Sequence, residues 1–338
     1  MTAVPKRMGN QTVGFSQPPR ILSVATVAGP REGAGPMGSL LDLVVEDTLV
    51  GCKTWEQAEA SMLESAVNLC LKKANMSSDK VQFLIAGDLL NQIVSSSYMA
   101  RQVGIPFIGI YGACSTVSEG IALAAMIIDG GFADYVLVAT SSHHNTAERQ
   151  YRYPTEFGNQ RPPTAQWTVT GAAAILLTSQ VKSGPMVTSA TVGKVLDMGI
   201  KDPNDMGSAM APAAADTIHR HLTDTGRRPQ DYNAILTGDL GMVGKKIAGE
   251  LLRKSGLDLD GILDDCGLKI YSGSQDPHSG ASGCACSGLV LGCSLWPQLA
   301  SGSLRRVLLV ATGALHSPLS VQQGESIPSV AHAVCLEG

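Results

Sequence analysis

The sequence predicts an α/β protein made of two duplicated halves, related by a pseudo-twofold axis and stacked as five layers in the order α-β-α-β-α. Two observations carry this prediction: short apolar runs alternate with helix-like stretches, and tripeptides of the first half return in the same order in the second. The 338 residues, 44% hydrophobic and 16% charged, exceed one ordinary core and suit a large interior with helices on both faces of a sheet. We expect the halves at about 20–180 and 185–338.

Four tripeptides make up the repeat. They are Ala25-Thr26-Val27 with Ala190-Thr191-Val192, Gly87-Asp88-Leu89 with Gly238-Asp239-Leu240, Ala113-Cys114-Ser115 with Ala285-Cys286-Ser287, and Val138-Ala139-Thr140 with Val310-Ala311-Thr312. The last two pairs keep the same spacing in both halves, and internal repeats can decide a fold. Because the segments around Cys114 and Cys286 are equivalent, each should open a central helix, and the two helices should lie side by side.

Each half offers strands followed by helices. The first half alternates strands at 81–86, 107–111 and 135–137 with helical stretches at 55–75, 91–103 and 117–130. The second alternates strands at 232–237 and 307–309 with helical stretches at 211–225, 244–255 and 287–301. This alternation is typical of parallel-sheet units, and nearly continuous apolar strands are expected where both faces of a sheet are covered. Asp88 and Asp239, at two strand ends, are expected to cap the backbone that follows them.

Composition and charge exclude several classes of function. A net charge of -4 with scattered Lys and Arg provides no basic surface for nucleic acid. Residues 1–20 lack the apolar stretch of a signal peptide, and no apolar run is long enough for a transmembrane segment, so we expect a soluble chain. The eight cysteines should be reduced thiols, and Cys284-Ala285-Cys286 lacks the spacing and partners of a zinc site. We expect neither a metal nor a cofactor.

Cys114 is the candidate nucleophile. Gly112 and Ala113 permit a tight turn after an apolar strand, and Ser115 and Thr116 are residue types that start helices. A thiol at this place would face unpaired N–H groups and the positive end of the helix dipole, which stabilise a thiolate and lower the pKa of the cysteine. The alternative is a small buried thiol that packs a junction between strand and helix.

A long polar insertion, residues 143–168, follows the strand that ends at Thr140. Long loops at strand ends are often functional, and this one carries three arginines among the rings of Tyr151, Tyr153 and Trp167. Guanidinium groups pair with carboxylates, and aromatic rings can cover a flat molecule, so the insertion predicts a site for a planar anion. The predicted ligand-binding set is Cys114, His143, His144, Arg149, Arg152, Arg161, Thr164, Thr168 and Ser282. Alternatively, the insertion is a flap in a dimer, with its arginines solvated or paired with Glu148 and Glu156.

Several motifs together resemble a known family. The loops Gly112-Ala113-Cys114-Ser115 and Gly280-Ala281-Ser282-Gly283, with the strand entry Thr170-Gly171-Ala172-Ala173-Ala174, resemble the thiolase and ketoacyl-synthase superfamily. More specific segments, at 86–92, 147–156, 205–218 and 325–328, resemble the stage V sporulation protein AD family. This similarity runs from about Ala28 to the C-terminus.

The resemblance implies a thiolase-like fold and a role in spore formation and germination. It implies binding of dipicolinic acid (pyridine-2,6-dicarboxylic acid), whose uptake into the spore needs partners among the membrane and soluble proteins of the same sporulation operon. It also implies association with the spore inner membrane and a homodimer. Thiolase-like proteins pair through the strand that corresponds to Phe107–Tyr111, and here the run 105–110 has no charge to protect an edge.

The chain departs from the enzymes of the superfamily in its histidines. Ketoacyl synthases of the acyl-carrier type have His-x-x-Asn where this chain has Gly238-Asp239-Leu240-Gly241, and thiolases have Gly-His-Pro-x-Gly where it has Asp276-Pro277-His278-Ser279-Gly280. One hypothesis is a binding protein for a pyridine dicarboxylate, with Cys114 lining a former acyl-transfer pocket. The other is an acyltransferase or condensing enzyme with Cys114 as nucleophile and His278, or else His143 or His144, as base. Because condensation needs more than a thiolate, the missing histidine favours the binding protein.

Overall fold

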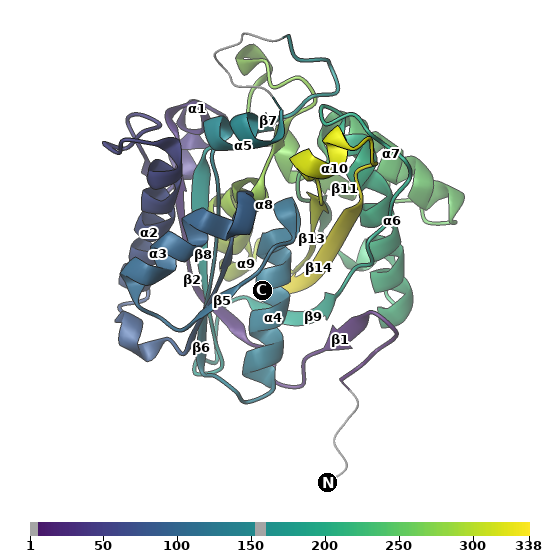
Figure 1. Ribbon diagram of the computed structural model, residues 1–338. Helices are drawn as coiled ribbons and strands as arrows, with labels where there is room; N and C mark the ends of the chain where they lie inside the picture. The colour runs from purple at the N-terminus through teal and green to yellow at the C-terminus, as the bar shows by residue number, and fades with distance from the viewer. Residues whose placement is uncertain (1–5, 153–159) are drawn as a thin grey trace.

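The computed structural model describes residues 6–152 and 160–338 and has five layers (Figure 1). Two groups of strands enclose a central layer of helices, and two long helices cover the outer face of each group. The predicted α/β architecture is therefore confirmed. The boundaries of the two halves, at 20–180 and 185–338, stay a prediction.

The first group of strands has the order β2-β8-β6-β4-β5. Its strands are β2 (Arg20–Ala28), β4 (Phe83–Gly87), β5 (Phe107–Gly109), β6 (Tyr135–Ser142) and β8 (Gly171–Thr178). β4 runs parallel to β5 and β6, and β8 lies antiparallel between β2 and β6. The outer face is covered by α2 (Trp55–Lys73) and α3 (Val94–Val103), whose apolar faces share a core with these strands. Thr54 starts α2 by accepting a hydrogen bond from the Gln57 N–H at 3.3 Å.

The second group has the order β9-β14-β13-β10-β11. Its strands are β9 (Met186–Thr191), β10 (Ala234–Thr237), β11 (Leu263–Asp265), β13 (Arg306–Ala314) and β14 (Ser329–Glu337). β10 runs parallel to β11 and β13, and β14 lies antiparallel between β13 and β9, so the first group's pattern returns. α6 (Met206–Thr225) and α7 (Gly241–Lys254) cover the outer face. The two groups join edge to edge through the pairing of Arg20 with Met186.

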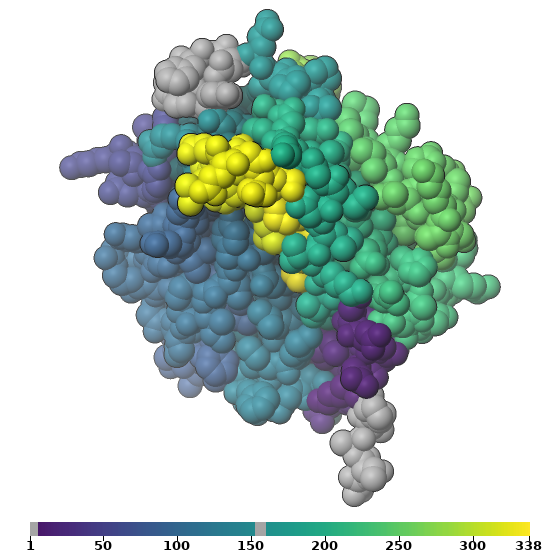
Figure 2. Space-filling model, turned by 45° about the vertical axis from the view of Figure 1, so that its right-hand side comes forward, coloured from purple at the N-terminus to yellow at the C-terminus, as the bar shows by residue number. Residues whose placement is uncertain are grey.

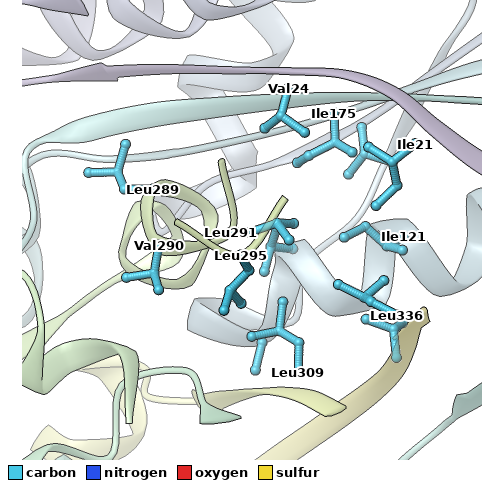
Figure 3. Packing of buried hydrophobic residues seen from close by; sticks show 14 of the residues in the cluster. Ile21, Val24, Ile121, Ile175, Leu289, Val290, Leu291, Leu295, Leu309 and Leu336 are labelled. Carbon is cyan, nitrogen blue, oxygen red and sulfur yellow. The ribbon is translucent and has the colours of Figure 1, made fainter. Parts of the chain in front are cut away.

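The central layer holds α4 (Thr116–Asp129) and α8 (Cys284–Val290), and α8 continues through a π-helical turn (Leu291–Leu295) into α9 (Trp296–Ala300). Figure 3 shows side chains of this layer packed between the two groups of strands: Ile121, Leu289, Val290, Leu291 and Leu295 with Val24 and Ile175 on one side and Leu309 and Leu336 on the other. Each fully buried side chain of this size contributes about 1.5–3 kcal/mol. Cys114 lies in the turn that directly precedes α4, and α8 contacts α4, so the predicted pair of neighbouring central helices is confirmed.

Short elements complete the described fold. β1 (Thr12–Gly14) pairs with β9, β3 (Leu43–Val44) with β2, and β7 (Trp167–Thr168) with β12 (Ala281–Ser282). The short helices are α1 (Pro30–Gly33), α5 (His144–Tyr151) and α10 (Pro318–Gln322). α5, β7 and α10 lie at the same end of the layers (Figure 1), and Figure 2 shows the residues around α10, in yellow, at the surface between the first and second halves.

The insertion at 143–168 is partly helical, and the expectation of a continuous loop is wrong for α5. His143 starts this helix because its Nδ1 accepts a hydrogen bond from the Asn145 N–H at 3.2 Å. Residues 153–159, which include Tyr153 and Glu156, lie outside the described residues. None of the described helices is both long and apolar enough to cross a membrane.

Candidate functional site

Cys114 lies in a 3-10 turn, Ala113–Ser115, that leads from β5 into α4. The Ala113 backbone is left-handed, with φ 49°, and its carbonyl oxygen accepts hydrogen bonds from the Thr116 hydroxyl at 2.6 Å and the Cys284 thiol at 3.0 Å. The end of β13 packs so closely on this turn that a Cβ at Gly313 would lie 2.1 Å from the Gly112 carbonyl oxygen. These contacts from both halves fix the position of the thiol.

The expectation that the helix would lower the pKa of Cys114 is wrong. The residue is only 6% exposed, and burial raises the pKa of its thiol well above the ordinary value. The carboxyl group of Asp239 raises this pKa further, because a negative charge beside the sulfur disfavours a thiolate. The site therefore keeps the thiol neutral, since the cost of desolvation exceeds the stabilisation that the helix provides.

Asp239 ties two loops to the Cys114 turn. Its carboxylate accepts hydrogen bonds from the Gly283 N–H at 2.9 Å and the Thr312 hydroxyl at 2.7 Å, and burial raises its pKa to about 7. The N–H groups after Asp239 bond instead to Asp265, so the expected cap at Asp239 is wrong. The expected cap at Asp88 is confirmed, because its carboxylate accepts from the N–H groups of Leu90 and Ser96.

A small cavity adjoins Cys114. Its polar and aromatic lining comprises Tyr111, Cys114, Tyr151, Arg152, Thr168, Ser282 and His316, and its apolar lining comprises Leu89, Ala113, Ala147, Met206 and Ala314. Its volume is about 20 Å³, which holds about one water molecule. The cavity brings together four residues of the predicted set, namely Cys114, Arg152, Thr168 and Ser282, and the last two face each other in the pairing of β7 with β12.

Arg152 is the predicted arginine that reaches the cavity. Its side chain is 7% exposed and forms an ion pair with Glu148, which is 12% exposed. Its Nε also donates to the Pro203 carbonyl oxygen at 3.3 Å, so the guanidinium bridges α5 and the segment that leads into α6. Arg149 points elsewhere, because it is 49% exposed, pairs with Glu56 and does not line the cavity.

The indole of Trp167 packs against one imidazole and two guanidinium groups. His144 stacks on it with a ring separation of 3.7 Å, and the guanidinium groups of Arg31 and Arg161 lie 3.8 and 4.8 Å from its ring centre. The pKa of His144 is lowered to about 3, mainly by burial and to a smaller extent by the nearby charges of Arg152, Arg161 and Arg31. Burial also lowers the pKa of Arg161, while Glu148 and Asp276 oppose that shift. Of the two carboxylates near Arg161, the one on Glu148 also pairs with Arg152, and the one on Asp276 is exposed.

Three other predicted residues, His143, His278 and Thr164, do not line the Cys114 cavity. His143 Nε2 is bonded to the Thr48 carbonyl oxygen at 2.8 Å, and burial lowers the pKa of this histidine. His278 Nδ1 is bonded to the Pro162 carbonyl oxygen at 2.8 Å, with Asp276 at 3.5 Å from its Nε2. Neither imidazole is therefore placed as a base for Cys114.

Sequence reasoning missed three residues of the site, namely Tyr111, Arg31 and His316. The Tyr111 hydroxyl lies 3.0 Å from that of Tyr151, Arg31 comes from a distant helix, and His316 lines the cavity after β13. A signal for His316 was present, because the spacing that relates Cys114 to Cys286 also relates His144 to His316. Among residues 6–152 and 160–338, no group of three or more His, Cys, Asp or Glu side chains could hold a metal ion.

Comparisons with known proteins agree with this fold. The family model described as Stage V sporulation protein AD (SpoVAD) matches residues 9–337. The chain is 51% identical over 332 residues to Stage V sporulation protein AD of Bacillus subtilis (strain 168), and the match covers 98% of each chain.

Solved structures of condensing enzymes are similar in fold alone. The 3-oxoacyl-(acyl-carrier-protein) synthase III of Aquifex aeolicus VF5 has a TM-score of 0.60 at 13% identity, covering 95% of this chain and 100% of that one. Cerulenin-bound OleA of Xanthomonas campestris has a TM-score of 0.60 at 17% identity, covering 95% of this chain and 99% of that one. This protein has a thiolase-like fold and belongs to the stage V sporulation protein AD family of sporulation proteins.

Proposed function

We propose that this sporulation protein binds dipicolinic acid in the Cys114 cavity and supports its movement across the spore inner membrane during sporulation and germination. In this proposal it acts as a homodimer and works with membrane and soluble proteins of the same operon. The observation that carries the proposal is a buried cation, Arg152, in a cavity that also presents Tyr151, Thr168 and Ser282. A carboxylate removed from water needs such a cation or several donors.

The charge around the cavity supports an anionic ligand. Arg31, Arg152 and Arg161 are close enough to lower the pKa of His144 together, and Glu148 is the counter-charge of Arg152 and Arg161. Dipicolinate is a dianion at neutral pH, so its entry would compensate the remaining positive charge. The hydroxyl groups of Thr168 and Ser282 can donate to a second carboxylate, and the ring of Tyr151 can cover the pyridine.

The ligand is larger than one water molecule, so the cavity has to widen when the ligand binds. Tyr151 and Arg152 lie at the end of α5 and Met206 at the start of α6, and all three line the cavity. Long side chains at helix ends can change rotamer without disturbing the strands. We therefore place the widening in these side chains and leave the Cys114 turn unchanged.

Acyl transfer at Cys114 has less support. A nucleophilic thiol has to ionise, whereas burial and Asp239 raise the pKa of this one. The single histidine of the cavity lining, His316, makes no hydrogen bond to a described residue and so does not activate the thiol. Condensing enzymes rely on a base or donor placed at their nucleophile.

The test is calorimetric titration of the wild-type protein with dipicolinate, beside mass spectrometry of the protein after incubation with acyl-CoA. We expect saturable one-site binding of dipicolinate, no binding of pyridine, which lacks both carboxylates, and no acyl adduct. An acyl group on Cys114, together with no heat from dipicolinate, would favour the acyltransferase instead.

A further inference from the structure

His316 is a cavity residue that the proposed function does not yet use. It follows β13, is 5% exposed and lines the same cavity as Cys114 and Arg152. Its ring centre lies 5.1 Å from that of Tyr151 at an interplanar angle of 34°, so the two rings form adjoining walls. A histidine in this position is within reach of any molecule that enters the cavity.

Both ring nitrogens of His316 are buried without a hydrogen-bond partner among the described residues. Two other buried histidines, His221 and His143, are bonded on both nitrogens, and a third, His144, has only its Nδ1 buried without a partner among the described residues. His221 is bonded to the hydroxyl groups of Thr191 and Tyr232, each at 2.8 Å, and His143 to the Thr48 carbonyl oxygen and the Asn145 N–H. An unsatisfied buried polar group costs free energy, so His316 is poorly explained as a residue that merely supports the fold.

The surroundings of His316 make it a neutral donor. Burial is the larger cause that lowers its pKa, to about 4, and the charge on Arg152 is the second. A neutral imidazole carries one N–H and one free acceptor nitrogen. The N–H matches a carboxylate oxygen, the group that we propose Arg152 binds in the cavity.

We infer that His316 is a ligand-contacting residue, whose imidazole N–H donates a hydrogen bond to a carboxylate of the anion bound beside Arg152. This inference rests on the proposed function and adds a residue that follows β13 to a site that otherwise depends on Arg152 at the end of α5, Thr168 of β7 and Ser282 of β12. It assigns His316 to recognition of the anion and not to activation of Cys114.

Variants at His316 and His221 separate ligand contact from support of the fold. His316→Phe keeps an aromatic ring and removes both nitrogens, so its unfolding midpoint should be unchanged or higher, while dipicolinate binding weakens roughly 10- to 150-fold. His221→Phe breaks two hydrogen bonds and should lower the midpoint. His316→Gln retains an N–H donor and should bind more tightly than His316→Phe, and His219→Gln on α6 is the control for binding.

The measurements are calorimetric titration with dipicolinate and thermal unfolding without ligand. Equal affinity of the wild type and both His316 variants would overturn the inference and leave the proposed function standing. A loss of stability in His316→Phe and His316→Gln as large as in His221→Phe would also overturn it, because His316 would then support the fold. Absence of binding by the wild type would instead remove the proposed function, and the role of His316 with it.

Discussion

Replacing Arg152 by glutamine tests the proposed site, because the burial of this side chain sets how much affinity for dipicolinate should be lost. The side chain is 7% exposed, so its hydrogen bonds to a bound carboxylate would be shielded from water. A hydrogen bond to a charged group contributes about 1.5–3 kcal/mol, which predicts binding of dipicolinate about 10- to 150-fold weaker in Arg152→Gln. The assay is calorimetric titration at a temperature well below the unfolding midpoint.

The same change should also destabilise the protein without ligand. Glu148, with 12% exposure, would lose its ion-pair partner, and breaking a buried pair costs about 3–5 kcal/mol. The double variant Glu148→Gln with Arg152→Gln removes the stranded carboxylate, so it should recover most of the stability and none of the affinity. This comparison separates a loss of fold from a loss of ligand contact.

Arg149 provides the matched control on the same helix. It is 49% exposed and pairs with Glu56, so Arg149→Gln should change the affinity by less than about twofold. Arg161→Gln should weaken binding through the loss of nearby positive charge, by less than Arg152→Gln. If all three single variants bind dipicolinate as the wild type does, the ligand binds elsewhere and the reasoning from Arg152 is refuted.

Three further predictions concern the thiol, a buried acid and the exposed edge of the first group of strands. Cys114→Ala should reduce dipicolinate binding modestly and lower the free energy of unfolding, measured with urea, by on the order of 1 kcal/mol. Loss of an acyl-CoA activity that the wild type has would contradict a binding role. The pKa of Glu59 is raised from 4.5 to about 8 by burial and by Asp88, so its contribution to stability is complete below pH 4.5 and is lost as pH rises through about 8. Between these pH values the free energy of unfolding of the wild type should fall by up to about 1.4 kcal/mol per pH unit, and that of Glu59→Gln should not show this fall. Equal dependence of the free energy of unfolding on pH in the two proteins would count against a buried neutral acid. In the proposed dimer β5 is the contact edge, with Phe107 and Ile108 each 37% exposed. Sedimentation should therefore show a dimer for the wild type and a monomer for Ile108→Lys. A wild-type monomer at micromolar concentration would disprove the dimer.

The layers of the fold were predictable because they depend on local patterns. The expected helix at 55–75 is α2, Trp55–Lys73, and the expected helix at 117–130 is α4, Thr116–Asp129, since apolar spacing and capping residues are readable along the chain. The expected helix at 211–225 begins five residues earlier, at Met206, where Asp205 accepts a hydrogen bond from the Ser208 N–H. α5 was missed because its residues are mostly polar.

The site was less predictable because its chemistry depends on segments far apart in the sequence. The pKa of Cys114 is set by burial and by Asp239, and neither can be judged from the neighbours of the cysteine in the chain. Arg149 and Arg152 look alike in the sequence, yet only Arg152 lines the cavity. His316 lines the same cavity as Cys114 because the end of β13 packs on the turn before α4, a contact between the two halves.

A crystal structure of the protein with dipicolinate tests the central claim most directly. The account predicts a planar ligand in a widened Cys114 cavity, with one carboxylate on Arg152 and His316, the other near Thr168 and Ser282, and an unmodified thiol at Cys114. Ligand density at another place, such as the groove between α2 and α3 that Tyr98 and Glu64 line, with the Cys114 cavity unchanged, would contradict it.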